Sequence, residues 1–191
     1  MPKSRFFINI MCASILVIPN SVSAEITIDR NTSSYWEGKS GWKIYSYPDE
    51  DMCEMAKNQL PDEHFTLAYF PKDKVFGLVF TNANATSLEG GSSVKLNVVL
   101  KKNGPIDLGW GSKDFEIVTT DGNVAFSTFL HSPIDTDIAQ SESISIFRKD
   151  VAGKPVIVAF VDLDGSSEAI KKLISCAIIA AKLNPNDPFL K

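Results

Sequence analysis

Residues 114–130, DFEIVTTDGNVAFSTFL, carry the clearest structural signal in this chain. Two runs rich in β-branched and aromatic residues, 114–119 and 123–130, flank Asp121-Gly122, and Asp-Gly between apolar runs is a strong signal of a β-hairpin. In the second run the side chains alternate between two faces, with one face formed by Val124, Phe126, Thr128 and Leu130. The stretch therefore predicts two antiparallel strands joined by a tight turn.

Six further runs show the same signs of short strands bounded by turn residues. They are residues 42–47, 64–70, 74–81, 94–100, 143–149 and 154–162. About eight strands at roughly even spacing predict a mainly β fold, an antiparallel sandwich or barrel. The last run contains VIVAFV, which is apolar on both faces, so we expect it to be a central strand or one covered on both sides.

One amphipathic helix is expected near the C-terminus and should pack on the sheet. Its apolar residues repeat at helical spacing: Ala169, Ile170, Leu173, Ile174, Ala177, Ile178 and Ala181. Ser166 or Ser167 is expected to cap its start. Two shorter segments are less distinct. Residues 49–59 fit either a short helix or a strand with a bulge, and residues 133–142 fit one helical turn.

The first 24 residues have the features of a secretory signal peptide. Lys3 and Arg5 precede the mostly apolar run 6–18, and small residues lead up to Ala24. The apolar run is shorter than the roughly 20 residues that a helix needs to span a bilayer. We therefore expect cleavage near Ala24 and a periplasmic or secreted protein.

Cleavage would leave 167 residues, enough for one domain with a sizeable core. We expect residues 25–41 to be an N-terminal extension and residues 42–191 to be a single β-rich domain. The cleaved chain has 17 basic and 23 acidic residues, a net charge of −6. An acidic domain without a basic cluster is a poor ligand for nucleic acid or anionic lipid, and its charge favours a basic protein partner. We expect no membrane span.

Two cysteines remain after cleavage, Cys53 and Cys176. An even number of cysteines in an exported chain favours a disulfide. Cys176 falls with Ala169 and Leu173 on the flank of the apolar helix face, where it is turned toward the sheet. A catalytic thiol or an intermolecular bridge is the alternative, although the acidic residues around Cys53 disfavour a reactive thiolate.

The sequence offers few catalytic or metal-binding groups. Asp162, Asp164 and Gly165 resemble part of a calcium loop, but their spacing does not match that of the EF-hand. His131 with Asp135 and Asp137 forms a conceivable hydrolase or metal site, although a lone histidine at a strand edge is more often a surface residue. We therefore expect a protein that is not an enzyme and that needs no metal or cofactor.

Aromatic and acidic residues in loops are the candidate partner-binding residues, because exposed aromatic side chains anchor protein partners. The candidates are Trp36, Trp110, Asp135 and Asp137. Large apolar side chains are nevertheless more often buried, so the two tryptophans also fit a role in covering the open end of the core. The loops expected to carry function are residues 82–93, 104–113 and 131–142.

Several motifs occur in a distinctive order: Trp42-Lys43-Ile44-Tyr45, Cys53, FVDLDGSSEAIKKLISC at 160–176, and Asn186-Asp187-Pro188-Phe189. This order resembles a group of exported, functionally uncharacterised proteins of Gram-negative bacteria, especially alphaproteobacteria. In that group an early Trp and Cys precede the strands, a Leu-x-Gly-Ser turn and a helix that contains a Cys. The ending is also similar to invasion-associated locus B proteins, which usually carry further cysteines, including a Gly-Cys pair.

The resemblance implies an exported protein, and in the locus B case a link to host-cell entry. Three functions are compatible with the sequence. The first is a non-catalytic periplasmic binding or interaction protein, of which a lipocalin-like ligand barrel is a variant. The second is an inhibitor or immunity-type protein that masks a basic envelope enzyme or toxin. The third is a hydrolase or metal-dependent enzyme that uses His131.

Overall fold

The computed structural model describes residues 34–38, 40–60, 63–82, 85, 88, 90–102, 108–120, 123–131 and 133–183. The expected signal peptide, residues 25–33 and the Asp-Pro-Phe motif lie outside these ranges. No described helix is long and apolar enough to cross a membrane.

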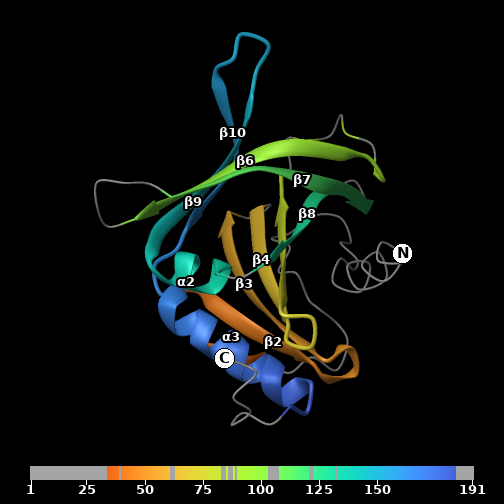
Figure 1. Cartoon of the computed structure of the whole chain (residues 1–191), viewed down its shortest axis with the longest axis vertical. Coiled ribbons are helices and arrows are strands. Elements are labelled where there is room, and N and C mark those ends of the chain that lie inside the picture. Colours follow the sequence, from red (N-terminus) through yellow and green to blue (C-terminus); the bar gives the residue numbers. More distant parts are fainter. Residues whose placement is uncertain are drawn as a thin grey trace.

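The described elements follow one another in the order β1 (Ser34–Glu37), β2 (Trp42–Tyr47), η1 (Pro48–Glu50), β3 (Met52–Leu60), β4 (Glu63–Phe70), β5 (Val75–Thr81), β6 (Ser93–Lys102), β7 (Leu108–Thr120), β8 (Asn123–His131), α2 (Ile134–Ala139), β9 (Ser141–Lys149), β10 (Pro155–Asp162) and α3 (Ser166–Ala180). The ten strands form one antiparallel sheet in the order β1-β2-β3-β4-β5-β8-β7-β6-β9-β10. In Figure 1 β6 and β7 run across the direction of β3 and β4, so the sheet bends over its own core. The predicted mainly β fold with one C-terminal helix is confirmed.

All eight predicted strands are present, and the hairpin predicted for residues 114–130 pairs as expected. Thr120 lies opposite Asn123 at the turn end of β7 and β8. Likewise β4 pairs with β5, and β9 with β10. One strand, β1, was missed, and it lies within the segment expected to be an extension. The ambiguous segment 49–59 forms a 3₁₀ turn followed by β3, a strand with a bulge between Asn58 and Leu60, which is one of the two alternatives left open by the sequence.

β10 is an edge strand, and among the described strands it pairs with β9. The prediction that VIVAFV would be central or covered on both sides is therefore wrong. Val156 is 39% exposed, Ile157 64% and Phe160 49%. A run that is apolar on both faces is typical of a buried strand, but the first residue of this strand is Pro155. Proline cannot donate to a strand ladder and is confined to strand starts and sheet edges, which explains the observed position.

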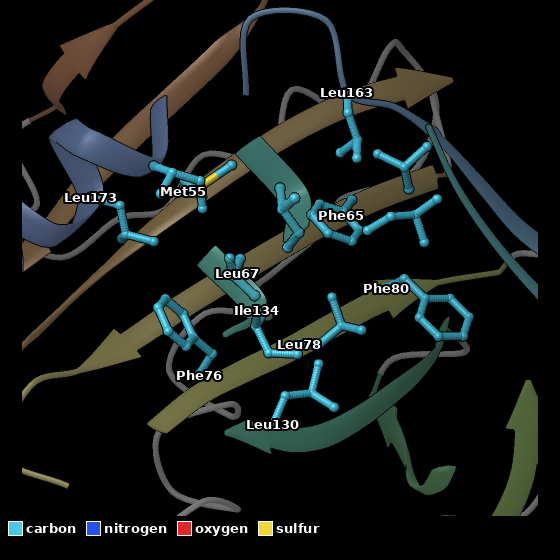
Figure 2. Close-up of a cluster of buried hydrophobic side chains, with 14 of the residues drawn as sticks. Met55, Phe65, Leu67, Phe76, Leu78, Phe80, Leu130, Ile134, Leu163 and Leu173 are labelled. Carbon is cyan, nitrogen blue, oxygen red and sulfur yellow. The ribbon is translucent and has the colours of Figure 1, made fainter. Parts of the chain in front are cut away.

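The core lies inside the bent sheet and is closed by the two helices. Figure 2 shows Leu67 of β4, Leu78 of β5 and Leu130 of β8 pointing into one cluster, with Ile134 of α2 among them. Ile134 and Ile138 are both buried, so α2 packs against the core and covers it. The short helical turn predicted within residues 133–142 is thus confirmed.

α3 lies across β2 and β3 (Figure 1) and is tied to the sheet by a disulfide. Cys53 of β3 is bonded to Cys176 of α3, with 6.0 Å between their Cα atoms. Ala169 and Leu173 share the buried face of the helix with Cys176, as the helical spacing predicted. The predicted intramolecular pairing of the two cysteines is confirmed.

The turn before α3 is anchored to strands far away in sequence. Trp42 donates its Nε1–H to the Asp164 carbonyl at 2.8 Å, and Ser40 Oγ donates to Asp164 Oδ2 at 3.0 Å. Lys57 Nζ donates to the Asp162 carbonyl at 2.9 Å. The acidic turn that resembles a calcium loop in sequence therefore serves to join the end of β10 to β2 and β3.

The expected serine cap of α3 is wrong. The N-cap residue is Gly165, at φ 77°, and no side chain caps the helix start. Ser166 instead donates its hydroxyl to the Ile138 carbonyl at 3.0 Å, which links α3 to α2. The turn needs a left-handed residue at position 165, and glycine adopts that conformation without a steric penalty.

Gly165→Ala is expected to lower the free energy of unfolding by about 2 kcal/mol, because a left-handed backbone strains any residue with a β-carbon and this β-carbon would overlap Ser40. Gly153→Ala is the matched control: Gly153 has φ 78°, but nothing lies near its β-carbon position. The control should lose only about 1 kcal/mol. Urea unfolding of both variants checks this, and equal losses would contradict the contact with Ser40.

Candidate functional site

Exposed apolar side chains gather on the β9–β10 hairpin. Four of the seven large exposed apolar side chains in the described residues lie there: Val151, Val156, Ile157 and Phe160. The pairing of β9 with β6 ends at Phe147, opposite Asn97. Residues 148–157 therefore continue as a two-stranded ribbon, which stands clear of the other strands in Figure 1. We call residues 148–157 the hairpin arm.

The turn of the hairpin arm is organised by Asp150. Its N–H donates to the Lys154 carbonyl at 2.9 Å. Its Oδ1 accepts from the backbone N–H of Ala152 at 2.9 Å and of Lys154 at 2.8 Å. Gly153 supplies the left-handed residue of the turn. These contacts hold the two strands in register, so the arm presents its apolar side chains from a defined hairpin.

The outer edge of β10 is open at the arm. Asp150 donates its N–H to the Lys154 carbonyl at the turn end of the ladder, so Lys154 bonds toward β9. From there to Ile157 the pairing is regular, and a β-bulge follows between Ile157 and Ala159. Because successive residues of an antiparallel ladder point alternately toward and away from the neighbouring strand, Val156 bonds toward β9 and Ile157 points away. The N–H and C=O of Ile157 thus face outward, and among the described strands none pairs with that edge.

The rest of the β10 edge is covered by side chains. The Val158 carbonyl accepts from Asn82 Nδ2 at 2.5 Å, and the Asp162 carbonyl accepts from Lys57 Nζ. Between these two contacts lies a small hollow lined by the ends of β4 and β5 and by residues 159–161. Its volume of about 10 Å³ fits roughly one water molecule, so it cannot hold a cofactor.

The hairpin arm is basic, although the chain as a whole is acidic. Arg148, Lys149 and Lys154 are all exposed, and Asp150 is the arm's one acidic residue. The arm therefore carries a formal charge of +2 in a chain whose net charge is −4. Exposed charges of one sign attract an oppositely charged partner over about 10 Å at moderate ionic strength.

Two of the predicted partner-binding residues contact each other. Trp110 of β7 donates its Nε1–H to Asp137 Oδ2 of α2 at 3.0 Å. Lys102 Nζ lies 3.9 Å from Asp137 Oδ1 and donates to Gln140 Oε1 at 3.2 Å. Trp110 is partly buried against the core. The group therefore ties α2 to the ends of β6 and β7 and presents no free aromatic anchor.

The other two candidates lie apart from the hairpin arm. Trp36 of β1 is partly buried against the core, with its ring directly over Gly38. Asp135 of α2 lies near Tyr69: burial raises the pKa of the Tyr69 hydroxyl, and the negative charge of Asp135 adds to the effect. Asp135 Oδ1 is shielded from solvent and has no hydrogen-bond partner among the described residues.

His131 is exposed at the end of β8, opposite Val75. Within the described residues no hydrogen bond joins it to Asp135 or Asp137. In the same part of the chain, no group of three His, Cys, Asp or Glu side chains is placed to hold a metal ion. The His-Asp-Asp site drawn from the sequence is therefore not assembled in the described structure.

One buried carboxyl was not singled out from the sequence. Glu54 of β3 is 6% exposed and accepts a hydrogen bond from the Tyr47 hydroxyl at 2.8 Å. The pKa of Glu54 is raised from 4.5 to about 7, chiefly by burial; the Tyr47 hydrogen bond opposes the shift, and the charge of Glu50 adds to it. A carboxyl of this kind titrates near neutral pH and makes the stability of the sheet sensitive to pH.

No protein-family model matches the chain, and no curated protein sequence matches it. A solved structure that resembles it is the crystal structure of invasion associated protein B from Bartonella henselae. The two are 16% identical, with a TM-score of 0.50, and the match covers 76% of this chain and 97% of the other. At this identity the likeness shows a shared fold, and the distant similarity noted in the sequence extends to the structure.

Proposed function

We propose that this protein is an exported, non-catalytic binding protein of the bacterial periplasm, and that it contacts a protein partner through the hairpin arm. The observation that carries the proposal is the exposure of Val151, Val156 and Ile157 on a two-stranded ribbon. Soluble proteins rarely leave apolar side chains gathered on a protruding element unless a partner covers them.

Export is supported by two independent features. The N-terminal pattern is that of a signal peptide. The Cys53–Cys176 disulfide fits an oxidising compartment such as the periplasm, because cytosolic thiols are kept reduced.

The charge of the hairpin arm bears on the kind of partner. An inhibitor or immunity-type protein that masks a basic enzyme would need an acidic contact surface. The arm carries Arg148, Lys149 and Lys154, which would repel such an enzyme. We therefore propose a general binding role for the arm, in preference to the masking of a basic enzyme.

Co-purification from the native envelope tests the proposal. The tagged wild-type chain is compared with an arm variant, Val156→Thr with Ile157→Thr, in which β-branched residues preserve the strand while apolar surface is lost. Ile179→Thr is the matched control, since Ile179 is 62% exposed on α3, away from the arm. We expect a stoichiometric protein partner with the wild type and the control, and its loss with the arm variant. No partner, or equal recovery with the arm variant, would contradict the proposal.

A further inference from the structure

We infer that the partner supplies an extended, acidic segment that adds as a strand to the outer edge of β10 at Pro155–Ile157. The inference rests on the proposed binding role of the hairpin arm and specifies the chemistry of its partner. Three features of the arm carry it: the outward backbone groups, the apolar side chains beside them, and the surrounding positive charge.

Within the part of the chain that the structure describes, the outer edge of β10 presents unpaired backbone groups at the hairpin arm. The Ile157 N–H and C=O and the Pro155 C=O point away from β9, by the alternation of the ladder. The same edge is closed farther along, where Asn82 and Lys57 bond to the Val158 and Asp162 carbonyls. An open edge of this kind is a template for another strand, whose main chain supplies the complementary donor and acceptors.

The side chains beside the open edge are apolar on both faces. Val156 lies opposite Arg148, and Ile157 lies opposite Phe147, so the two side chains project to opposite faces of the ribbon. A strand added at this edge would place its own side chains next to both. Apolar residues in the added strand would then cover Val156 and Ile157, which are 39% and 64% exposed in the free chain.

The positive charge of the hairpin arm favours an added strand with acidic side chains. Arg148, Lys149 and Lys154 flank the open edge, and Asp150 is already engaged by the backbone N–H groups of Ala152 and Lys154. Acidic side chains in the added segment would face these cations. Opposite charges on neighbouring strands stabilise pairing, whereas like charges destabilise it.

The same charge disfavours a second copy of this chain as the occupant. Pairing β10 with itself about a two-fold axis would bring two arms together, each with three cations and one anion. A membrane is disfavoured for another reason. Lipid would attract the cations, but its hydrocarbon offers no partner for the outward N–H and C=O groups of β10. A protein strand satisfies the charge and the backbone together.

Photo-crosslinking in the native envelope tests the inference. A photoreactive residue is placed at Val156, whose N–H faces β9, and at Ile179 as the control position. We expect adducts at position 156 in about tenfold excess over position 179, and peptide mapping should place them on one acidic segment of another protein. Raising the ionic strength to about 0.5 M should reduce the yield, because the attraction is screened.

Three variants, two at Ile157 and one at Lys154, separate the backbone, side-chain and charge contributions. Ile157→Pro removes an outward N–H that makes no bond to β9, and it should reduce the adducts about tenfold, as expected for a lost hydrogen bond. Ile157→Thr keeps the N–H and should reduce them about twofold. Lys154→Glu reverses one flanking charge and should reduce them about fivefold. Circular dichroism of each variant confirms that the sheet is retained.

The outcomes separate the inference from the proposed function. Adducts at position 156 with lipid, with this chain itself, or with a segment that is not acidic would overturn the inference. An equal effect of Ile157→Pro and Ile157→Thr would also overturn it, because the contact would then use side chains alone. Failure of the proposed function looks different: neither position gives a protein adduct, and co-purification yields no partner.

Discussion

The Cys53→Ala, Cys176→Ala double variant is expected to lose about 4 kcal/mol in its free energy of unfolding. The disulfide joins residues 123 apart in the sequence, so it restricts the unfolded chain over most of the domain. It also fastens α3 to β3, where both cysteines are buried. Urea unfolding followed by tryptophan fluorescence measures the loss, since Trp42 is wholly buried beside this helix and its turn.

Chemical reduction of the wild-type protein is the matched control for this variant. The reduced wild type and the double variant should unfold at similar urea concentrations, both well below that of the oxidised protein. A loss smaller than about 1 kcal/mol would mean that the packing of α3 on the sheet, rather than the disulfide, holds the helix in place.

Glu54→Gln is expected to raise the free energy of unfolding at pH 8 by up to about 3 kcal/mol. The folded state raises the pKa of Glu54 from 4.5 to about 7, chiefly by burial. The folded protein therefore binds this proton more tightly than the unfolded chain does. The contribution of Glu54 to stability is full below pH 4.5, falls as the pH rises to about 7, and stays low above it.

The comparison of pH profiles tests the prediction for Glu54. Between pH 4.5 and 7.5 the wild type should lose stability relative to Glu54→Gln, whose amide stays neutral and still accepts the Tyr47 hydrogen bond. Glu142→Gln, a change at an exposed carboxyl on β9, should keep the wild-type profile. Parallel profiles for the wild type and Glu54→Gln would show that Glu54 titrates as an exposed carboxyl does.

The elements of this fold that follow from local sequence were predictable. Alternation and turn residues identify β7 and β8, and helical spacing identifies α3 and the inward face that carries Cys176. β3 was ambiguous because its charged and polar residues conceal an inward face of Cys53, Met55 and Lys57. Its Lys57 is buried over the Trp42 ring and bonded to the end of β10, a contact that no local pattern encodes.

The candidate site was harder to predict because it depends on which strand lies at the edge. The order of strands depends on contacts between distant parts of the chain. The apolar run VIVAFV alone does not distinguish a central strand from an edge strand. Pro155 was the residue that indicated an edge strand, because proline cannot donate a hydrogen bond to a neighbouring strand. The sequence suggested Trp110 and Asp137 separately as candidate partner-binding residues. Their hydrogen bond arises because α2 folds against the end of β7, which leaves both side chains committed to the structure.

Hydrogen exchange at the Ile157 amide tests the central claim most directly. In the isolated chain this amide should exchange much faster than that of Val156, because Val156 bonds to β9 and Ile157 faces outward. In the complex recovered from the envelope, exchange at Ile157 should slow to the rate of a paired strand residue. An Ile157 amide that is already protected in the isolated monomer, or that exchanges equally fast in the complex, would contradict the account.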